Sequence, residues 1–150
     1  MKEELSELTF IDVNVFMYAA GKPHPYKEPC VQILSDVENG ILSALINTEI
    51  FQELLYRYYH IKLAEKGVEL CRHILQLQFK ILPITEMDIR LAIDLFDSLQ
   101  NKGLKPRDAI HAATMKNNDI NKIISADRDF DSIDFVQRID PLNYKYLHEN

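Results

Sequence analysis

Short apolar runs alternate with segments of helical periodicity along most of this 150-residue chain. Four of the runs have the length and composition of buried strands: 8–13, 79–84, 122–126 and 135–139. A further run, 41–46, is ambiguous between strand and loop. Strands that alternate with helices predict a parallel sheet covered by helices on both faces. We therefore expect an α/β protein with a three-layer α/β/α arrangement and a central parallel sheet.

Two of the expected helical segments have recognisable N-termini. Thr48 is a suitable N-cap for a helical hairpin over 49–78. Thr85 and Asp88 match a capping box, with Asp in the position usually held by Glu, and open a further helix. Both segments follow apolar runs, which supports the alternating order of strands and helices.

The bulk composition fits a single folded domain over residues 1–150. With 47% hydrophobic residues and only four glycines, the chain resembles neither a disordered protein nor one with a Gly-rich phosphate loop. Two cysteines, no apolar signal core and no run of about 20 apolar residues favour a reduced, cytoplasmic location. The net charge of −6 disfavours binding of nucleic acid by a broad basic surface. It leaves open a nuclease whose metal ions supply positive charge.

Four acidic residues lie at predicted strand ends and helix starts: Asp12, Glu49, Asp108 and Asp127. In a wound parallel sheet these positions meet at the carboxyl edge, where ligands bind. Four carboxylates brought together repel one another, and a hard divalent cation relieves that repulsion. Oxygen ligands from Asp and Glu suit Mg²⁺ or Mn²⁺ better than zinc. The pattern therefore predicts a Mg²⁺ or Mn²⁺ site.

The identity of the fourth acid is open, because Asp129 follows Asp127 by two residues in a turn. The run of aspartates there does not make a calcium loop, since Ser132 stands where such a loop needs Gly. His111 lies on the same helical face as Asp108. We interpret His111 as a packing or hydrogen-bonding residue rather than as a metal ligand.

The motifs around these acids resemble those of PIN-domain nucleases, and within them the VapC-type toxins of bacteria and archaea. FIDVNVFMYA, with Asp12 and Asn14, resembles the first acidic motif, and the Thr48–Glu49 step the second. RDAIHAAT resembles the third, at Asp108. ISADRDFD resembles the closing motif, with Ser125 and Asp127 in its hydroxyl and acid positions. One departure is Val13, where many relatives carry Thr or Ser.

The resemblance implies metal-dependent hydrolysis of RNA that leaves a 5′-phosphate and a 3′-hydroxyl. It also implies a homodimer and, for a toxin, inhibition by a cognate antitoxin protein. On this interpretation Asp12 and Asp108 are the central ligands, and Glu49 and Asp127 complete the metal site. Asn14 and Ser125 would hold a water or a carboxylate in place. The number of metal ions is left open.

Two other functions fit the same motifs. One is a housekeeping PIN nuclease that processes RNA without an antitoxin, and the other is a catalytically silent PIN fold that binds RNA or protein. The complete set of acids argues against the silent module, because a binding module has no need of mutually repelling carboxylates. Basic residues before Asp108 are candidates for contacts with RNA phosphates or for a solvated loop: Lys102, Lys105 and Arg107.

Overall fold

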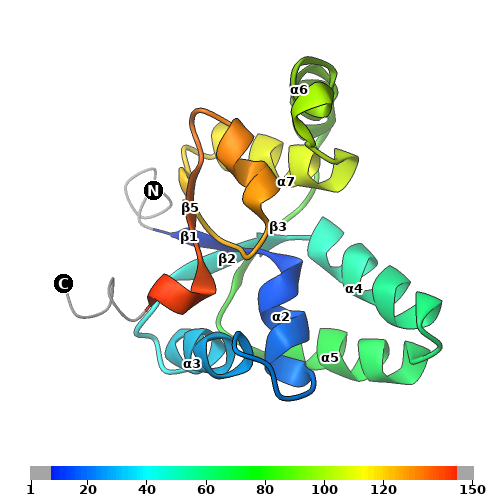
Figure 1. The fold of residues 1–150 in the computed structure, drawn as a ribbon, viewed down its shortest axis with the longest axis vertical. Helices are drawn as coiled ribbons and strands as arrows, with labels where there is room; N and C mark the ends of the chain where they lie inside the picture. Colours follow the sequence, from blue (N-terminus) through cyan, green and yellow to red (C-terminus); the bar gives the residue numbers. More distant parts are fainter. Residues whose placement is uncertain (1–7, 145–150) are drawn as a thin grey trace.

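The computed structural model describes residues 8–144, and its centre is a five-stranded parallel sheet (Figure 1). The strand order is β3-β2-β1-β4-β5. All pairings in this sheet are parallel. The strands are β1 (Thr9–Ile11), β2 (Ala44–Asn47), β3 (Lys80–Leu82), β4 (Lys122–Ile124) and β5 (Gln137–Ile139). The predicted parallel sheet is confirmed, and the ambiguous run 41–46 contributes most of β2.

Helices cover both faces of this sheet, which confirms the three-layer α/β/α arrangement (Figure 1). α2, α3 and α5 lie on one side, and α6 and α7 lie on the other. The helices are α2 (Val13–Ala20), α3 (Lys27–Glu38), α4 (Glu49–His60), α5 (Ala64–Gln76), α6 (Glu86–Leu99) and α7 (Pro106–Asn117). Three short 3-10 helices complete the described chain: η1 (Gln100–Lys102), η2 (Arg128–Ser132) and η3 (Pro141–Asn143). Across residues 8–144, no helix is long and apolar enough to cross a membrane.

The strand order places a topological switch point between β1 and β4. From β1 the chain moves outward to β2 and β3, and then α6 and α7 return it to β4 on the other side of β1. A crevice opens at the carboxyl ends of strands where the order reverses in this way. Asp12 directly follows β1 and Ser125 directly follows β4, so both lie at that crevice.

The central strands are more deeply buried than the edge strands β3 and β5. β1, β2 and most of β4 are buried along their length, as expected for strands covered on both faces. Helix α4 buries Ile50, Leu54 and Tyr58, which lie on one helical face at spacings of four residues. Glu53 is buried on the same helix, next to Leu54. A carboxylate in that position must be paired or bound.

The predicted helix starts have two different outcomes. At α6 the capping box is confirmed: Thr85 Oγ1 accepts a hydrogen bond from the Asp88 N–H (3.1 Å), and Asp88 Oδ2 accepts one from the Thr85 N–H (3.0 Å). At α4 Thr48 is the N-cap residue, as predicted, but its side chain makes no capping hydrogen bond. Its hydroxyl instead accepts from the Ile84 N–H at 3.3 Å, which ties the end of β3 to the start of α4.

Candidate metal centre

Asp12 is buried at the start of α2, and the protein itself holds its carboxylate. Its Oδ1 accepts a hydrogen bond from the Val13 N–H at 2.8 Å. Its Oδ2 accepts from Ser125 Oγ at 2.6 Å and from Asn14 Nδ2 at 3.1 Å. Burial raises the pKa of Asp12, while the His111 ring and the Ser125 hydroxyl act in the opposite direction. The orientation of Asp12 is thus fixed before any ligand arrives.

Asn14 and Ser125 connect the end of β1 to the loop after β4. Asn14 Nδ2 also donates to Ser125 Oγ at 3.2 Å, and Asn14 Oδ1 accepts from the Ala126 N–H at 3.2 Å. Ser125 Oγ accepts from the Asp127 N–H at 3.0 Å. These bonds place Asn14 and Ser125 around Asp12, the positioning role that the sequence predicts for them.

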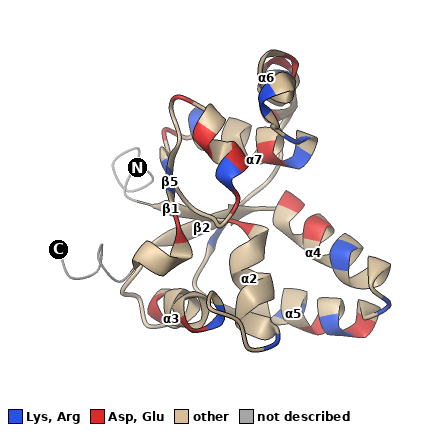
Figure 2. Cartoon of the chain, viewed as in Figure 1, with Lys and Arg blue, Asp and Glu red and all other residues tan. Residues whose placement is uncertain are grey.

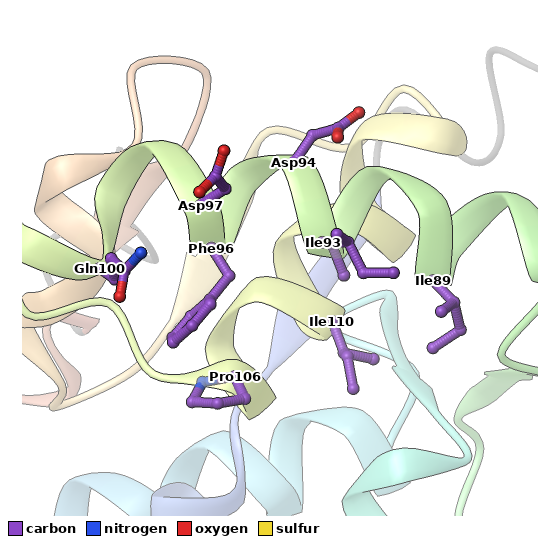
Figure 3. Close-up of a pocket in the computed structure, with 9 residues that line it drawn as sticks. Ile89, Ile93, Asp94, Phe96, Asp97, Gln100, Pro106 and Ile110 are labelled. Atoms are coloured by element: carbon purple, nitrogen blue, oxygen red, sulfur yellow. The ribbon is translucent and has the colours of Figure 1, made fainter.

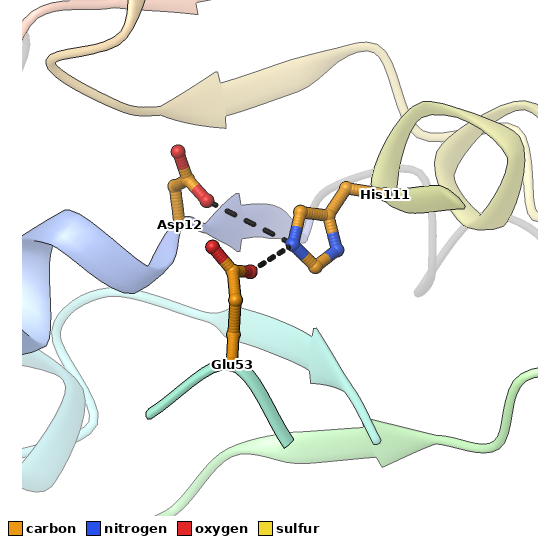
Figure 4. Close-up of side chains that lie close together, drawn as sticks. All are labelled: Asp12, Glu53 and His111. Atoms are coloured by element: carbon orange, nitrogen blue, oxygen red, sulfur yellow. Dashed lines mark hydrogen bonds and ion pairs between the residues drawn. The ribbon is translucent and has the colours of Figure 1, made fainter. Parts of the chain in front are cut away.

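Glu53 and His111 complete a buried group with Asp12 (Figure 4). One potential ligand atom of each residue lies within 4.8 Å of those of the other two. His111 Nε2 is 2.9 Å from Glu53 Oε1 and 3.9 Å from Asp12 Oδ1. Burial would raise the pKa of Glu53, but the hydrogen bond from His111, with two arginines nearby, lowers it overall.

The contact at His111 Nδ1, the ring nitrogen that faces away from Glu53, indicates which nitrogen carries the proton. His111 is fully buried, and its Nδ1 lies 3.1 Å from Asn47 Nδ2 at the end of β2. Because the amide Nδ2 is a donor, Nδ1 accepts and Nε2–H donates to Glu53. Asn47 Nδ2 also donates to Thr114 Oγ1 at 2.9 Å. The Thr114–Asn47–His111 chain therefore orients Glu53 toward Asp12, which supports the hydrogen-bonding interpretation of His111.

A second acidic group consists of Asp108, Asp127 and Asp129. Their nearest potential ligand atoms also lie within 4.8 Å of one another. Asp108 is buried in the first turn of α7, and the other two are partly exposed. The Asp127 carboxylate accepts from the Asp129 N–H at 2.9 Å and caps η2. Asp127 and Asp129 thus both belong to the group, so the structure does not select one of them as the fourth acid.

Asp108 is the least satisfied of these acids. In the described part of the chain, its Oδ2 and the Oδ1 of Asn47 are the buried side-chain polar atoms without a hydrogen-bond partner. Burial, followed by the charges of Asp12 and Asp127, raises the pKa of Asp108 to about 9. Glu53 contributes in the same direction. The charge of Asp108 is therefore coupled to acids of both groups, which form one electrostatic unit.

The structure does not bring Glu49 into either group. Among residues 8–144, the groups with metal-binding spacing contain Glu53 and omit Glu49. Glu49 begins α4, one helical turn before Glu53, and its side chain is partly exposed. Burial raises the pKa of Glu49, while His111 lowers it. Glu49 is therefore near the centre, whereas Glu53 lies against Asp12.

Sequence reasoning missed Glu53, although a signal for it was present. Glu53 stands between Phe51 and Leu54, and it follows the buried Ile50 by three residues. A carboxylate on the apolar stripe of an amphipathic helix is the same anomaly that marks Asp12 in its strand. Helical phasing from Ile50, Leu54 and Tyr58 would have placed Glu53 toward the core.

The donor set fits a hard divalent cation. Carboxylate oxygens converge from β1, α4, α7 and the loop after β4, and one buried oxygen of Asp108 has no other partner in the described chain. Figure 2 shows the acidic residues near the edge of the sheet where α2 and α4 begin. Such oxygen ligands and unrelieved repulsion are what Mg²⁺ or Mn²⁺ sites require. The residues present could hold a metal ion.

Basic side chains border the centre. Arg57 Nη2 and Arg107 Nη1 lie 3.5 Å and 3.9 Å from Glu53 Oε2. Lys105 Nζ contacts Asp129 Oδ2 at 3.2 Å. These residues offset part of the negative charge and lie where a phosphate could approach.

A separate cavity of about 460 Å³ lies between α6 and α7 (Figure 3). Apolar side chains dominate its lining, among them Ile89, Ile93, Phe96 and Ile110. Asp94 and Asp97 also line it, and Figure 3 shows both on α6. The cavity contains none of the acids of the two groups above, and its lining is distinct from the metal centre.

Comparison with known proteins identifies the family. Residues 9–136 match the family model of the PIN domain. The chain belongs to the PIN domain family.

Relatives and solved structures agree with this assignment. Ribonuclease VapC13 of Mycobacterium tuberculosis is 32% identical over 132 residues, covering 88% of this chain and 99% of the relative. Ribonuclease VapC2 of Methanocaldococcus jannaschii is 26% identical over 142 residues, covering 87% and 92%. The crystal structure of Mycobacterium tuberculosis VapC20, described as a Sarcin-Ricin loop cleaving toxin, superimposes with a TM-score of 0.72 at 12% identity, covering 85% and 96%. The structure of VapBC2 from Rickettsia felis, bound to a promoter DNA fragment, superimposes with a TM-score of 0.68 at 16% identity. The match covers 88% of this chain and 97% of that one.

Proposed function

We propose that this protein is a metal-dependent endoribonuclease and the toxin of a toxin–antitoxin pair. The observation that carries the proposal is the pair of acidic groups at the carboxyl edge of a PIN-type sheet, one with Asp12 and Glu53 and the other with Asp108. Relatives named as VapC ribonucleases support RNA as the substrate. The reaction is hydrolysis of a phosphodiester bond, in which water adds to phosphorus and the bond to the 3′-oxygen breaks.

A Mg²⁺ or Mn²⁺ ion would be held by Asp12, Asp108 and Glu53, with Asp127 and Asp129 as further candidate ligands. When bound, such an ion supplies positive charge at the phosphate and lowers the pKa of a bound water. Glu49 stays a further candidate in the adjacent turn of α4.

The protein's own residues provide the rest of the site. Ser125 and Asn14 hold Asp12, and His111 holds Glu53, so these acids need little reorganisation when a ligand binds. Arg57 and Arg107 lie beside Glu53 and would bind the substrate's phosphates. They would counter the repulsion between RNA and a chain of net charge −6.

The proposed partners are a cognate antitoxin and a second copy of this chain, in the cytoplasm. Solved relatives include toxin–antitoxin complexes, among them one from Klebsiella pneumoniae. The α4–α5 hairpin exposes large apolar side chains, which fits a protein-binding surface. They are Leu55, Tyr56, Tyr59, Ile61, Leu63, Val68 and Leu75.

Cleavage by purified protein tests the activity. A panel of single-stranded and structured RNAs is incubated with Mn²⁺, with Mg²⁺, and with EDTA, and the products are mapped at their ends. We expect cleavage with either ion, 5′-phosphate products, and no cleavage in EDTA. Asp108→Asn should abolish the activity while the fold persists by circular dichroism. Cleavage that survives Asp108→Asn, or products that end in a 3′-phosphate, would contradict the assignment.

A further inference from the structure

We propose that a cavity beside the metal centre is a nucleotide subsite that holds one unpaired RNA base next to the scissile phosphate. This inference rests on the proposed function and specifies its substrate as RNA that is single-stranded at the cut. The cavity has a volume of about 440 Å³, within the range of small-ligand pockets. It lies between α2, the loop that follows α2, and α4. Its lining includes Asn14, Tyr18, Lys22, Pro23, His24 and Arg57.

Two residues that line the cavity contact acids of the metal centre. Asn14 donates to Asp12 Oδ2 at 3.1 Å and to Ser125 Oγ at 3.2 Å. Arg57 Nη2 lies 3.5 Å from Glu53 Oε2. A nucleotide in the cavity would therefore be adjacent to a phosphate bound at the acids.

Aromatic rings form a stacked, pre-arranged surface in this region. The Tyr18 and His24 ring centroids are 4.8 Å apart with planes inclined by 27°, and those of Tyr18 and Tyr26 are 5.0 Å apart at 20°. Tyr26 Oη donates to Asp140 Oδ2 at 2.9 Å, and the Tyr26 N–H donates to His24 Nδ1 at 3.1 Å. Rings held in this way lose little freedom when a base stacks on them. Stacking on such rings is a common means of binding unpaired bases.

The charge of the lining favours a polyanion. Lys22 and Arg57 are cationic, and the residues that line the cavity include no acid. The cavity between α6 and α7 has Asp94 and Asp97 in its lining instead. Aromatic faces beside two cations match the needs of a base and its flanking phosphates, and a purely apolar ligand would use neither cation.

Paired substitutions in protein and RNA test the subsite. The probe is a fluorescein-labelled single-stranded RNA whose cleavage position has been mapped with the wild-type protein. Binding is measured in the Asp108→Asn background, and cleavage in the parent. We expect Tyr18→Ala and His24→Ala to weaken RNA binding about tenfold, while Tyr18→Phe retains it. His73→Ala, which removes an exposed histidine of α5 that does not line the cavity, is the matched control and should change neither measurement.

An abasic nucleotide identifies the contact. Abasic sites are placed one at a time on either side of the scissile bond. At one flanking position the abasic RNA should bind the Tyr18-containing protein about tenfold more weakly, and Tyr18→Ala should add nothing further. The proposal would be overturned if, at every abasic position, the loss of affinity from the abasic site and the loss from Tyr18→Ala multiplied. It would also be overturned if neither Tyr18→Ala nor His24→Ala changed RNA binding. That last result would point instead to a protein segment as the occupant.

The failure of this inference is distinguishable from failure of the proposed function. If the wild-type protein cuts RNA and the Tyr18 and His24 variants cut and bind it equally well, the subsite alone is refuted. If the wild-type protein cuts no RNA, the proposed function fails. The subsite is then judged by binding of a mixed-sequence 12-mer RNA, where a loss with Tyr18→Ala that Tyr18→Phe restores supports it and equal binding overturns it.

Discussion

Asp12 and Asp108 are both buried carboxylates at the same edge of the sheet, but their surroundings differ. Both oxygens of Asp12 accept hydrogen bonds from the protein, through Val13, Asn14 and Ser125. One oxygen of Asp108 is buried without a hydrogen-bond partner in the described chain, and the pKa of that carboxyl rises to about 9. The protein thus satisfies both oxygens of Asp12 and leaves one oxygen of Asp108 without a hydrogen bond.

This difference suggests a division of roles within the proposed site. A carboxylate with fixed hydrogen bonds provides geometry, because its rotamer is set before the ion binds. A buried carboxyl group whose pKa is raised by nearby acids becomes charged only at a cost in stability, and a bound cation would remove that cost. Asp12 would therefore define where the ion sits, and Asp108 would make binding strongly favourable.

The largest effect expected is that of removing the charge of Asp12. Asp12→Asn should reduce RNA cleavage on the order of 10³-fold, since it removes an acid at the centre of the proposed site. Asp36→Asn is the matched control, because Asp36 is also buried and hydrogen-bonded, by Gln32 and Tyr144. Cleavage rates measured under Mn²⁺ saturation compare the two variants.

Asp36→Asn should lower thermal stability and leave the rate per folded molecule nearly unchanged. If Asp12→Asn retained cleavage close to that of Asp36→Asn, Asp12 would be a structural helix cap of α2 and the comparison with Asp108 would lose its basis.

The next effect separates two acids on one helix. Glu53→Gln should reduce cleavage about 10²-fold, because Glu53 lies against Asp12 and His111. Glu49→Gln should change the rate by no more than about threefold, because Glu49 lies one turn away and is partly exposed. Single-turnover cleavage at matched protein concentration measures both. The reverse order of effects would return Glu49 to the centre of the site.

Much of the architecture could be predicted from the sequence, because periodicity reports burial. Strands β1 and β4 are mostly apolar, since helices cover both faces of the sheet, and helix α6 begins at the predicted capping box. The absence of a capping bond from the Thr48 side chain could not be predicted in the same way. Its hydroxyl accepts a hydrogen bond from the Ile84 N–H, which lies 36 residues further along the chain. The sequence around Thr48 gives no information about such a distant contact.

The candidate site was predictable only where an acid interrupts a strand or opens a helix. Asp12 and Asp108 stood out by that criterion, and the structure buries both. Glu53 was hidden because one carboxylate inside an amphipathic helix resembles its many exposed neighbours. Its significance depends on His111 and Asn47, which come from α7 and β2 and meet it only in the folded protein.

A smaller effect is expected at the histidine that supports Glu53. His111→Phe should weaken Mn²⁺ binding about tenfold, because Glu53 loses the N–H that orients it. His111→Gln, which retains an N–H donor, should recover part of that affinity. Isothermal titration with Mn²⁺ measures the affinity, and thermal unfolding checks that each variant is folded. Equal affinity for all three proteins would show that Glu53 does not depend on His111.

The smallest effect concerns the pH dependence of stability, which we expect to depend on Asp108. The pKa of Asp108 is about 9 in the folded chain against an ordinary value of 3.8, so the folded state retains a proton that the unfolded state releases. The metal-free protein should therefore lose stability as the pH rises from about 4 to 9. Asp108→Asn should flatten this decline and raise the melting temperature at pH 8 by several degrees, measured by circular dichroism in EDTA. Mn²⁺ should produce a similar rise in the parent and a much smaller one in Asp108→Asn, because the ion relieves the same repulsion. Parallel pH profiles for the two proteins would mean that Asp108 is already stabilised by the chain, as Asp12 is.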